Sequence, residues 1–250
     1  MYPREKVSKP YEGRMKPFRI IGNVYFVGTY QASSHLIDTG AGLILIDTGY
    51  ANTLYLLLES IWELGFKPWD IKYIVHSHYH GDHTAGTECL AELSGAKTVI
   101  GEHDKEPLLK AGYFVPDITV ADGETLTLGN TTLRFLHTPG HTVGTMSIFF
   151  DTEEDGKTYR VGTFGGAGAN TLAASSSGFY AGCRDAYLAS IERLLEEKVD
   201  VFIGNHCWNN DTKGRAARLA QGEKDAFVDE NEWPKFLRFC AERCKNLPPV

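Results

Sequence analysis

Four of the nine histidines in the chain fall within the stretch HSHYHGDH, from His76 to His83, and Asp82 lies among them. A solvated loop does not need so many imidazoles, and a core cannot hold several of them unpaired because buried polar groups without partners are costly. Imidazole nitrogens and carboxylate oxygens are ligands that zinc takes in proteins. The cluster therefore indicates a bound cation.

The spacing inside the cluster indicates how it could hold more than one ion. His78 and His80 alternate, so an extended segment places both side chains on the same side. Asp82 and His83 follow Gly81, which is expected to allow a tight bend toward a helix. The motif therefore offers two ligands to one ion and two to a neighbouring ion.

Two further histidines occur in a similar setting elsewhere in the chain. His141 stands in LHTPGHTVG, just after an apolar run at 131–137, and His206 stands in FIGNHCWNN, just after another at 199–204. Loops that leave rigid strand ends aim their side chains accurately. Each histidine is thus a candidate third ligand for one of the two ions.

The hydrophobic pattern predicts the elements that position these residues. Strand-like runs come first as meanders and then alternate with helical ones, and two facing sheets covered outside by helices would bury all their apolar faces. This is an α+β fold, an αββα four-layer sandwich, with a polar N-terminal arm at 1–17 and a single domain at 18–250. Strands are predicted at 18–28, 32–40, 42–49, 71–78, 97–101, 124–128, 131–137, 145–152, 157–165 and 199–204, and helices at 52–66, 84–95, 103–111, 184–198 and near the C-terminal end.

Composition narrows the class of protein. The 250 residues are 42% hydrophobic, and 25 Lys and Arg against 32 Asp and Glu give a net charge of −7, which exerts no pull toward nucleic acid. No apolar run approaches the ~18 residues of a membrane span. The start lacks a signal-peptide pattern, so we expect a cytoplasmic protein, or a periplasmic or secreted one if a leader was removed. Five scattered cysteines argue against a disulfide framework.

The HxHxDH motif followed by TPGH resembles the metallo-β-lactamase superfamily, and the resemblance extends from NVYFVGTYQASSHLIDTGAGLILIDTG to the second late histidine. It implies two zinc ions with three ligands each. It also gives Asp82 the catalytic role, and Asp47 is expected to orient ligands through hydrogen bonds. The ligands carried over by position are His78, His80 and His141 for one ion, and Asp82, His83 and His206 for the other.

One departure from the general pattern of the superfamily points to a subclass. Many members place an aspartate after a later strand to bridge both metals, and one lactamase subclass places a cysteine there. In this chain that strand ends VGTFGGAGAN, which puts Ala167 at the position. A second metal held without a bridging residue is the arrangement of the third subclass, B-three, which the overall spacing also resembles most.

The resemblance implies a hydrolase in which a metal-bound hydroxide attacks the carbonyl of a β-lactam, a small-molecule substrate. Zinc lowers the pKa of bound water to about 7, so such a nucleophile exists at neutral pH. Members of that subclass generally hold the substrate carboxylate with serines, where this chain has Ala167 and Ala169. Residues that could replace those serines are Asn170, Ser175, Ser176, Ser177, Tyr180 and Asn209.

Two alternatives remain open. A hydrolase of another ester, lactone or thioester, with little β-lactam activity, fits the same metal site, and the missing secretion signal counts against a dedicated antibiotic-resistance enzyme. An iron-dependent oxidoreductase that resembles persulfide dioxygenases belongs to another class and predicts a single iron, which a full set of six ligands disfavours. A nuclease would need a basic surface that the acidic composition does not offer.

Overall fold

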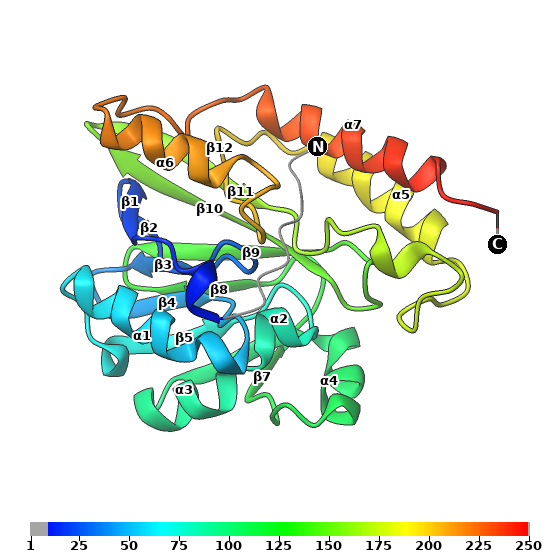
Figure 1. The fold of residues 1–250 in the computed structure, drawn as a ribbon, viewed down its shortest axis with the longest axis horizontal. Helices are drawn as coiled ribbons and strands as arrows, with labels where there is room; N and C mark the ends of the chain where they lie inside the picture. Colours follow the sequence, from blue (N-terminus) through cyan, green and yellow to red (C-terminus); the bar gives the residue numbers. More distant parts are fainter. Residues whose placement is uncertain (1–9, 250) are drawn as a thin grey trace.

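The computed structural model describes residues 10–249 of the chain, whose first half forms a seven-stranded sheet (Figure 1). The order of strands in this sheet follows their order in the chain. Strands β1 to β4 pair in antiparallel fashion, and β4 to β7 pair in parallel. The strands are β1 Phe18–Ile21, β2 Val24–Phe26, β3 His35–Asp38, β4 Leu43–Ile46, β5 Ile71–Val75, β6 Lys97–Gly101 and β7 Ile118–Val120.

The second half forms a five-stranded sheet in the order β12-β11-β10-β9-β8. Its strands are antiparallel except for the last, β12, which lies parallel to β11. The long hairpin of β10 and β11 forms its centre. The strands are β8 Thr125–Leu128, β9 Thr131–His137, β10 Met146–Glu154, β11 Lys157–Thr163 and β12 Val201–Phe202.

Helices provide the crossovers that parallel strands require. In the first half, α1 connects β4 to β5, α2 and α3 connect β5 to β6, and α4 connects β6 to β7. In the second half, α5 connects β11 to β12, and α6 and α7 close the chain. The helices are α1 Leu54–Glu63, α2 Gly81–Thr84, α3 Thr87–Ser94, α4 Lys105–Ala111, α5 Cys183–Leu195, α6 Thr212–Ala220 and α7 Glu232–Lys245.

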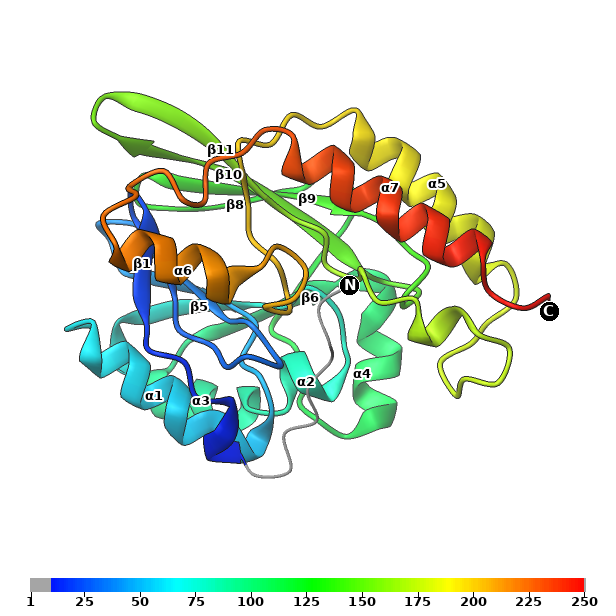
Figure 2. The same ribbon diagram turned by 45° about the horizontal axis from the view of Figure 1, so that its top comes forward.

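The core lies between the two sheets. Phe26 and Ile44 of the first sheet belong to the same buried cluster as Phe135 and Ile148 of the second. The outer face of the first sheet packs against α1 and α3, and that of the second packs against α5 and α7 (Figures 1 and 2). The predicted αββα sandwich of the α+β class is confirmed.

Helix α7 shows how an amphipathic sequence becomes part of this outer layer. Trp233, Leu237, Cys240 and Cys244 are buried and recur every three or four residues, which places them on one side of the helix. The indole nitrogen of Trp233 donates a hydrogen bond to the carbonyl of Leu194 on α5, at 3.0 Å. The opposite side of α7 is left to face other partners.

Several element boundaries differ from the prediction. The run at 18–28 is a hairpin, because the chain turns at Gly22 with φ of +51°. The helix expected at 84–95 is divided into α2 and α3, and β7 was not predicted because it is only three residues long.

The predicted N-terminal arm falls partly outside the described residues. Within the described part, the carbonyl of Gly13 accepts a hydrogen bond from the amide of Tyr30 at 2.9 Å. The division into an arm at 1–17 and a domain at 18–250 stays a prediction. All five cysteines are free, and no helix in the described part of the chain has the length and apolar character to cross a membrane.

Candidate metal centre

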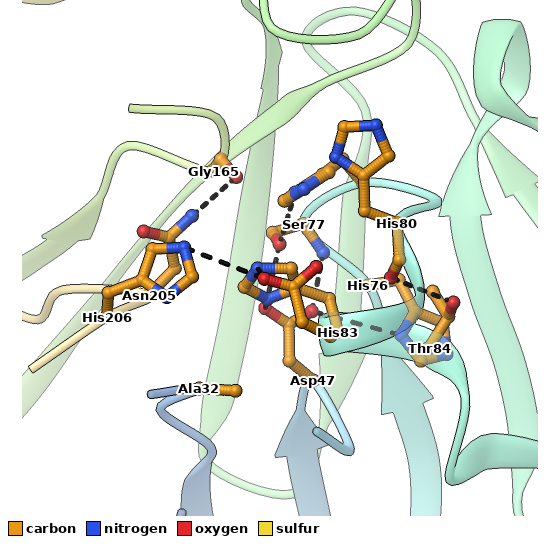
Figure 3. Close-up of polar contacts among 12 residues, drawn as sticks. Ala32, Asp47, His76, Ser77, His80, His83, Thr84, Gly165, Asn205 and His206 are labelled. Atoms are coloured by element: carbon orange, nitrogen blue, oxygen red, sulfur yellow. Dashed lines mark hydrogen bonds and ion pairs between the residues drawn. The ribbon is translucent and has the colours of Figure 1, made fainter. Parts of the chain in front are cut away.

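The predicted ligands come together where strand ends of both sheets meet (Figure 3). The loop after β5 and the short helix α2 bring four of them from the first sheet. The β9–β10 loop and the loop after β12 bring His141 and His206 from the second sheet. Residues far apart in the sequence therefore share one site, as the sequence predicts.

The first triad consists of His78, His80 and His141. Their ligand atoms all lie within 4.8 Å of one another. Nδ1 of His80 lies 3.0 Å from Nε2 of His141, and the ring of His78 lies edge-on to both other rings, with centroids 4.8 and 4.7 Å away. Three imidazoles thus face a common point, which is the geometry of a nitrogen-only metal site.

Hydrogen bonds fix which nitrogen each ring presents. The hydroxyl of Ser77 donates its one proton to Asp47 at 2.7 Å, so it accepts from Nδ1 of His78 at 3.1 Å. Nδ1 of His141 donates to the carbonyl of Gly168 at 2.7 Å. Both histidines therefore present the lone pair of Nε2, and bonding of the other ring nitrogen is the usual arrangement around metal-ligating histidines.

The second triad consists of Asp82, His83 and His206. Nε2 of His83 lies 3.4 Å from Oδ2 of Asp82, and both residues also fall within ligand distance of His78. Nε2 of His206 lies 3.9 Å from the same carboxylate oxygen, and its Nδ1 donates to the carbonyl of Gln31. The structure brings His206 to the edge of the group, and its assignment as a ligand stays a prediction.

Asp47 lies beneath the site and supports residues of both triads (Figure 3). Its carboxylate accepts hydrogen bonds from the amide and hydroxyl of Ser77 at 2.9 and 2.7 Å, and from Nδ1 of His83 at 2.8 Å. It adopts a φ of +59°, which is uncommon for a residue other than glycine. The geometry agrees with the orienting role expected for Asp47.

The two triads differ in their electrostatics. Burial lowers the pKa of His80 to about 4 and that of His141 to about 3, which keeps both rings neutral. Burial also acts to lower the pKa of His83, but the carboxylates of Asp82 and Asp47 outweigh it and raise this pKa to about 10. The first triad is thus a set of neutral nitrogens, whereas the second is built around negative charge.

Two buried nitrogen atoms show that the site fits a metal. Nε2 of His78 and Nε2 of His83 are buried and have no hydrogen-bond partner within residues 10–249. A buried nitrogen without a partner is costly, and a cation at the centre of each triad would satisfy both atoms. Nitrogen and carboxylate ligands with bonded outer nitrogens suit zinc.

Asp104 joins the two loops that supply the first triad. Its Oδ2 accepts from the amide of Tyr79 at 3.0 Å and from the hydroxyl of Thr142 at 2.8 Å, and its Oδ1 accepts from the amide of Gly144 at 2.7 Å. Burial raises the pKa of Asp104 to about 6 despite these bonds. The sequence gave no reason to single out this residue, because its partners are distant in the chain.

The role expected for Gly81 is not the one that the structure shows. Its φ lies outside the left-handed region, and it forms the first residue of α2. A Cβ at this position would lie 2.3 Å from the hydroxyl oxygen of Tyr113. The absence of a side chain therefore makes room for Tyr113 and is not needed for the bend.

A cleft of about 390 Å³ opens over the two triads and places some of the predicted substrate residues. Asn170, Ser176 and Ser177 line it. Ser175 is exposed and Tyr180 directs its hydroxyl to the carbonyl of Thr142 at 3.5 Å, and neither lines the cleft. Asn209 lines a neighbouring cavity and accepts a hydrogen bond from the amide of His206 at 3.0 Å. Substrate contacts by any of these residues stay predictions.

Three residues of the cleft wall were not singled out from the sequence: Tyr50, Tyr79 and Thr171. The hydroxyl of Thr171 also lies 3.1 Å from Nδ1 of His141. Tyr79 stands inside the histidine motif, so its position there was the one available signal. The other two follow from packing between distant loops.

The model of the metallo-beta-lactamase superfamily matches residues 27–206, more than half of the chain, and the chain belongs to this family. Solved structures of this family resemble the whole fold. A subclass B3 metallo-beta-lactamase of Bradyrhizobium japonicum is 31% identical, with a TM-score of 0.88 and 95% of each chain covered. A class B3 di-zinc metallo-beta-lactamase from an Alaskan soil metagenome is 26% identical, with a TM-score of 0.85 over 96% of this chain and 97% of the other.

Curated relatives match over shorter stretches. A lactamase-like protein of Emericella nidulans is 30% identical over 150 residues, 60% of this chain and 43% of that protein. A hydroxyacylglutathione hydrolase of Maricaulis maris is 36% identical over 78 residues, 30% of this chain and 28% of that protein. The match thus spans less than half the length of these two relatives. The family, its B-three likeness and its place among hydrolases are confirmed.

Proposed function

We propose that the chain is a dinuclear zinc hydrolase of the B-three type that opens the cyclic amide of a β-lactam. The observation that carries the proposal is the pair of buried, unpartnered nitrogens, Nε2 of His78 and Nε2 of His83, at the centres of two adjacent triads. The likeness to B3 metallo-beta-lactamases over nearly the full chain supports the choice of subclass and of zinc.

Zinc bound in these triads would lower the pKa of a bound water to about 7 and would polarise the carbonyl to be attacked. The residues of the chain hold the geometry for that chemistry. Ser77 and Gly168 fix the rings of the first triad, and Asp47 fixes His83. Asp82 contributes negative charge, which favours binding of a cation at the second position.

The cleft suits a small molecule with polar groups. Its wall combines the phenol rings of Tyr50 and Tyr79 with the amide of Asn170 and the hydroxyls of Ser176 and Ser177. A volume of about 390 Å³ falls in the range of small-ligand sites. The acidic net charge of −7 disfavours a nucleic acid as substrate.

Hydrolysis of an acyl thioester is the second candidate function. It rests on the likeness to hydroxyacylglutathione hydrolases, which covers about a third of the chain. The same metal site would serve it, so the two candidates differ only in the substrate. A lactone or another ester belongs to the same alternative.

The test is hydrolysis of a chromogenic cephalosporin by the zinc-loaded protein, with metal content measured on the same sample. We expect two zinc ions per chain and turnover that a chelator abolishes. S-Lactoylglutathione and an acyl-homoserine lactone serve as comparison substrates. Turnover of either without turnover of the cephalosporin would replace the β-lactam by that substrate, and a single tightly bound iron would contradict the hydrolase.

A matched pair of variants separates metal chemistry from general damage. His141→Ala removes a first-triad nitrogen, whereas His103→Ala removes an exposed histidine that lies outside both triads. We expect the first variant to lose activity and zinc, and the second to retain both.

A further inference from the structure

A second cavity, of about 330 Å³, lies beside the metal centre between the loop after β12 and helix α7. His206 lines both this cavity and the cleft over the triads. A molecule in the cleft can therefore extend past His206 toward α7. This cavity is called the α7 cavity below.

The face of α7 that lines the cavity is set by helical spacing. Glu232, Lys235, Phe239 and Arg243 follow one another at intervals of three or four residues, so their side chains share one side of the helix. The side that carries Trp233 packs into the protein instead. Helix α7 thus serves the core with one side and the α7 cavity with another.

The α7 cavity carries a surplus of positive charge. Within residues 10–249, neither the ammonium of Lys235 nor the guanidinium of Arg243 forms an ion pair. Glu232 lines the cavity as well, but it pairs with Arg215 at 3.1 Å. Two cations therefore face the cavity without a matching anion in the described part of the chain.

The rest of the wall is aromatic. Phe236 and Phe239 line the cavity from α7, and Phe239 remains 37% exposed although phenylalanine is usually buried. The guanidinium of Arg243 lies over the ring of Phe239, 5.6 Å from its centroid. Trp208 stacks on His206 with centroids 4.5 Å apart and the rings nearly parallel, at 8°.

A cavity with aromatic walls and unpaired cations fits one class of ligand, an aryl or other apolar group that bears a carboxylate. Apolar surface binds the body of such a molecule, and charge-assisted hydrogen bonds from Arg and Lys bind the anion. A neutral molecule of the same shape gains the first contribution but not the second.

We propose that the α7 cavity binds the carboxylate-bearing portion of the substrate, with Lys235 and Arg243 as specificity-determining residues. The inference rests on the proposed hydrolase function of the adjacent triads. It assigns the substrate class as anionic, with an apolar group next to the carboxylate and a hydrolysable carbonyl at the metal centre.

A pair of probes that differ in charge but hardly in shape tests the proposal directly. Binding of 4-fluorophenylacetate and of 4-fluorophenylacetamide to the zinc-loaded protein is followed by fluorine NMR. We expect Lys235→Ala combined with Arg243→Ala to weaken binding of the carboxylate about tenfold or more, and binding of the amide by less than about twofold.

The matched control is Arg238→Ala, an exposed arginine on the same helix that does not line the cavity. It should leave binding of both probes unchanged. Lys235→Met combined with Arg243→Met keeps the length of the side chains and removes the charges, so it should behave like the double alanine variant. Equal loss for both probes, or equal loss in the control, would overturn the proposal.

Kinetics separate this inference from the proposed function. If the chain hydrolyses the chromogenic cephalosporin, we expect the double variant to raise KM while kcat changes little. If the cephalosporin is not hydrolysed but the carboxylate probe still depends on Lys235 and Arg243, the β-lactam substrate is wrong and the anion site stands. Hydrolysis with an unchanged KM in the double variant would overturn the anion site and leave the hydrolase.

Discussion

The two triads of the metal centre are built from similar residues but are stabilised in different ways. In the first triad, neutral hydrogen bonds from Ser77 and to the carbonyl of Gly168 hold rings whose pKa values burial lowers. In the second triad, the carboxylates of Asp82 and Asp47 surround His83. Packing and backbone carbonyls prepare one half of the site, and charge prepares the other half.

The triads also differ in how closely they are assembled. The three ligand atoms of the first triad lie within 4.8 Å of one another. In the second triad, His206 comes from a separate loop and its Nε2 lies 3.9 Å from Asp82. We therefore expect the first position to hold its metal more tightly. The predictions below test this difference, from the largest expected effect to the smallest.

His78→Ala should abolish activity, because it removes a first-triad ligand that also lies within ligand distance of Asp82 and His83. The loss should exceed the roughly 100-fold that removal of an outer partner costs. Steady-state kinetics and zinc analysis of the purified variant measure it. Full activity at unchanged metal content would sink the mechanism, and His103→Ala is the control.

Asp82→Asn should cut turnover heavily while the fold is retained. The amide keeps the size of the side chain but removes the negative charge that favours the second cation, so we expect one zinc per chain to be lost first. Circular dichroism checks the fold, and kinetics with zinc titration check the site. A variant that keeps two tightly bound zinc ions would contradict the role of charge in the second triad.

Asp47→Asn should weaken the second position by about 10- to 100-fold in metal affinity, because Nδ1 of His83 loses its carboxylate acceptor. The first position should change less, since Asp47 reaches His78 only through Ser77. Zinc titration of the metal-free protein separates the two affinities. Asp38→Asn, outside the site on β3, is the matched control, and an equal loss at both positions would remove the contrast between the triads.

Thr171→Val should have the smallest effect, about threefold or less in kcat/KM, by analogy with the low end for a single neutral hydrogen bond. Nδ1 of His141 keeps the carbonyl of Gly168 as its acceptor when the hydroxyl of Thr171 is removed. Thr119→Val on the exposed side of β7 is the control. A loss as large as that of Asp47→Asn would show that the first triad also depends on a single outer contact.

The metal centre was more accessible to prediction from the sequence than the substrate site. The HxHxDH spacing and the two late histidines report ligands directly, because each stands next to a strand end that periodicity reveals. The neighbours of those ligands depend on packing between distant loops. Asp104 and Thr171 therefore gave no sequence signal, and neither did the cations of α7 that face the α7 cavity.

The fold followed the same division. The strand at 131–137 and the helices with strong periodicity were predicted nearly residue by residue. The prediction at 18–28 missed the turn at Gly22, and it missed β7, a three-residue strand whose pairing with β6 defines it. Long periodic runs carry their own signal, whereas short edge strands are set by their partners.

The central claim is that two separate triads hold two metal ions. Anomalous diffraction at the zinc edge, from crystals of the zinc-loaded protein, tests it most directly. The account predicts two peaks, one among Nε2 of His78, Nδ1 of His80 and Nε2 of His141, and one among Asp82, His83 and His206. A single peak at full occupancy, or a second peak away from Asp82 and His83, would contradict it.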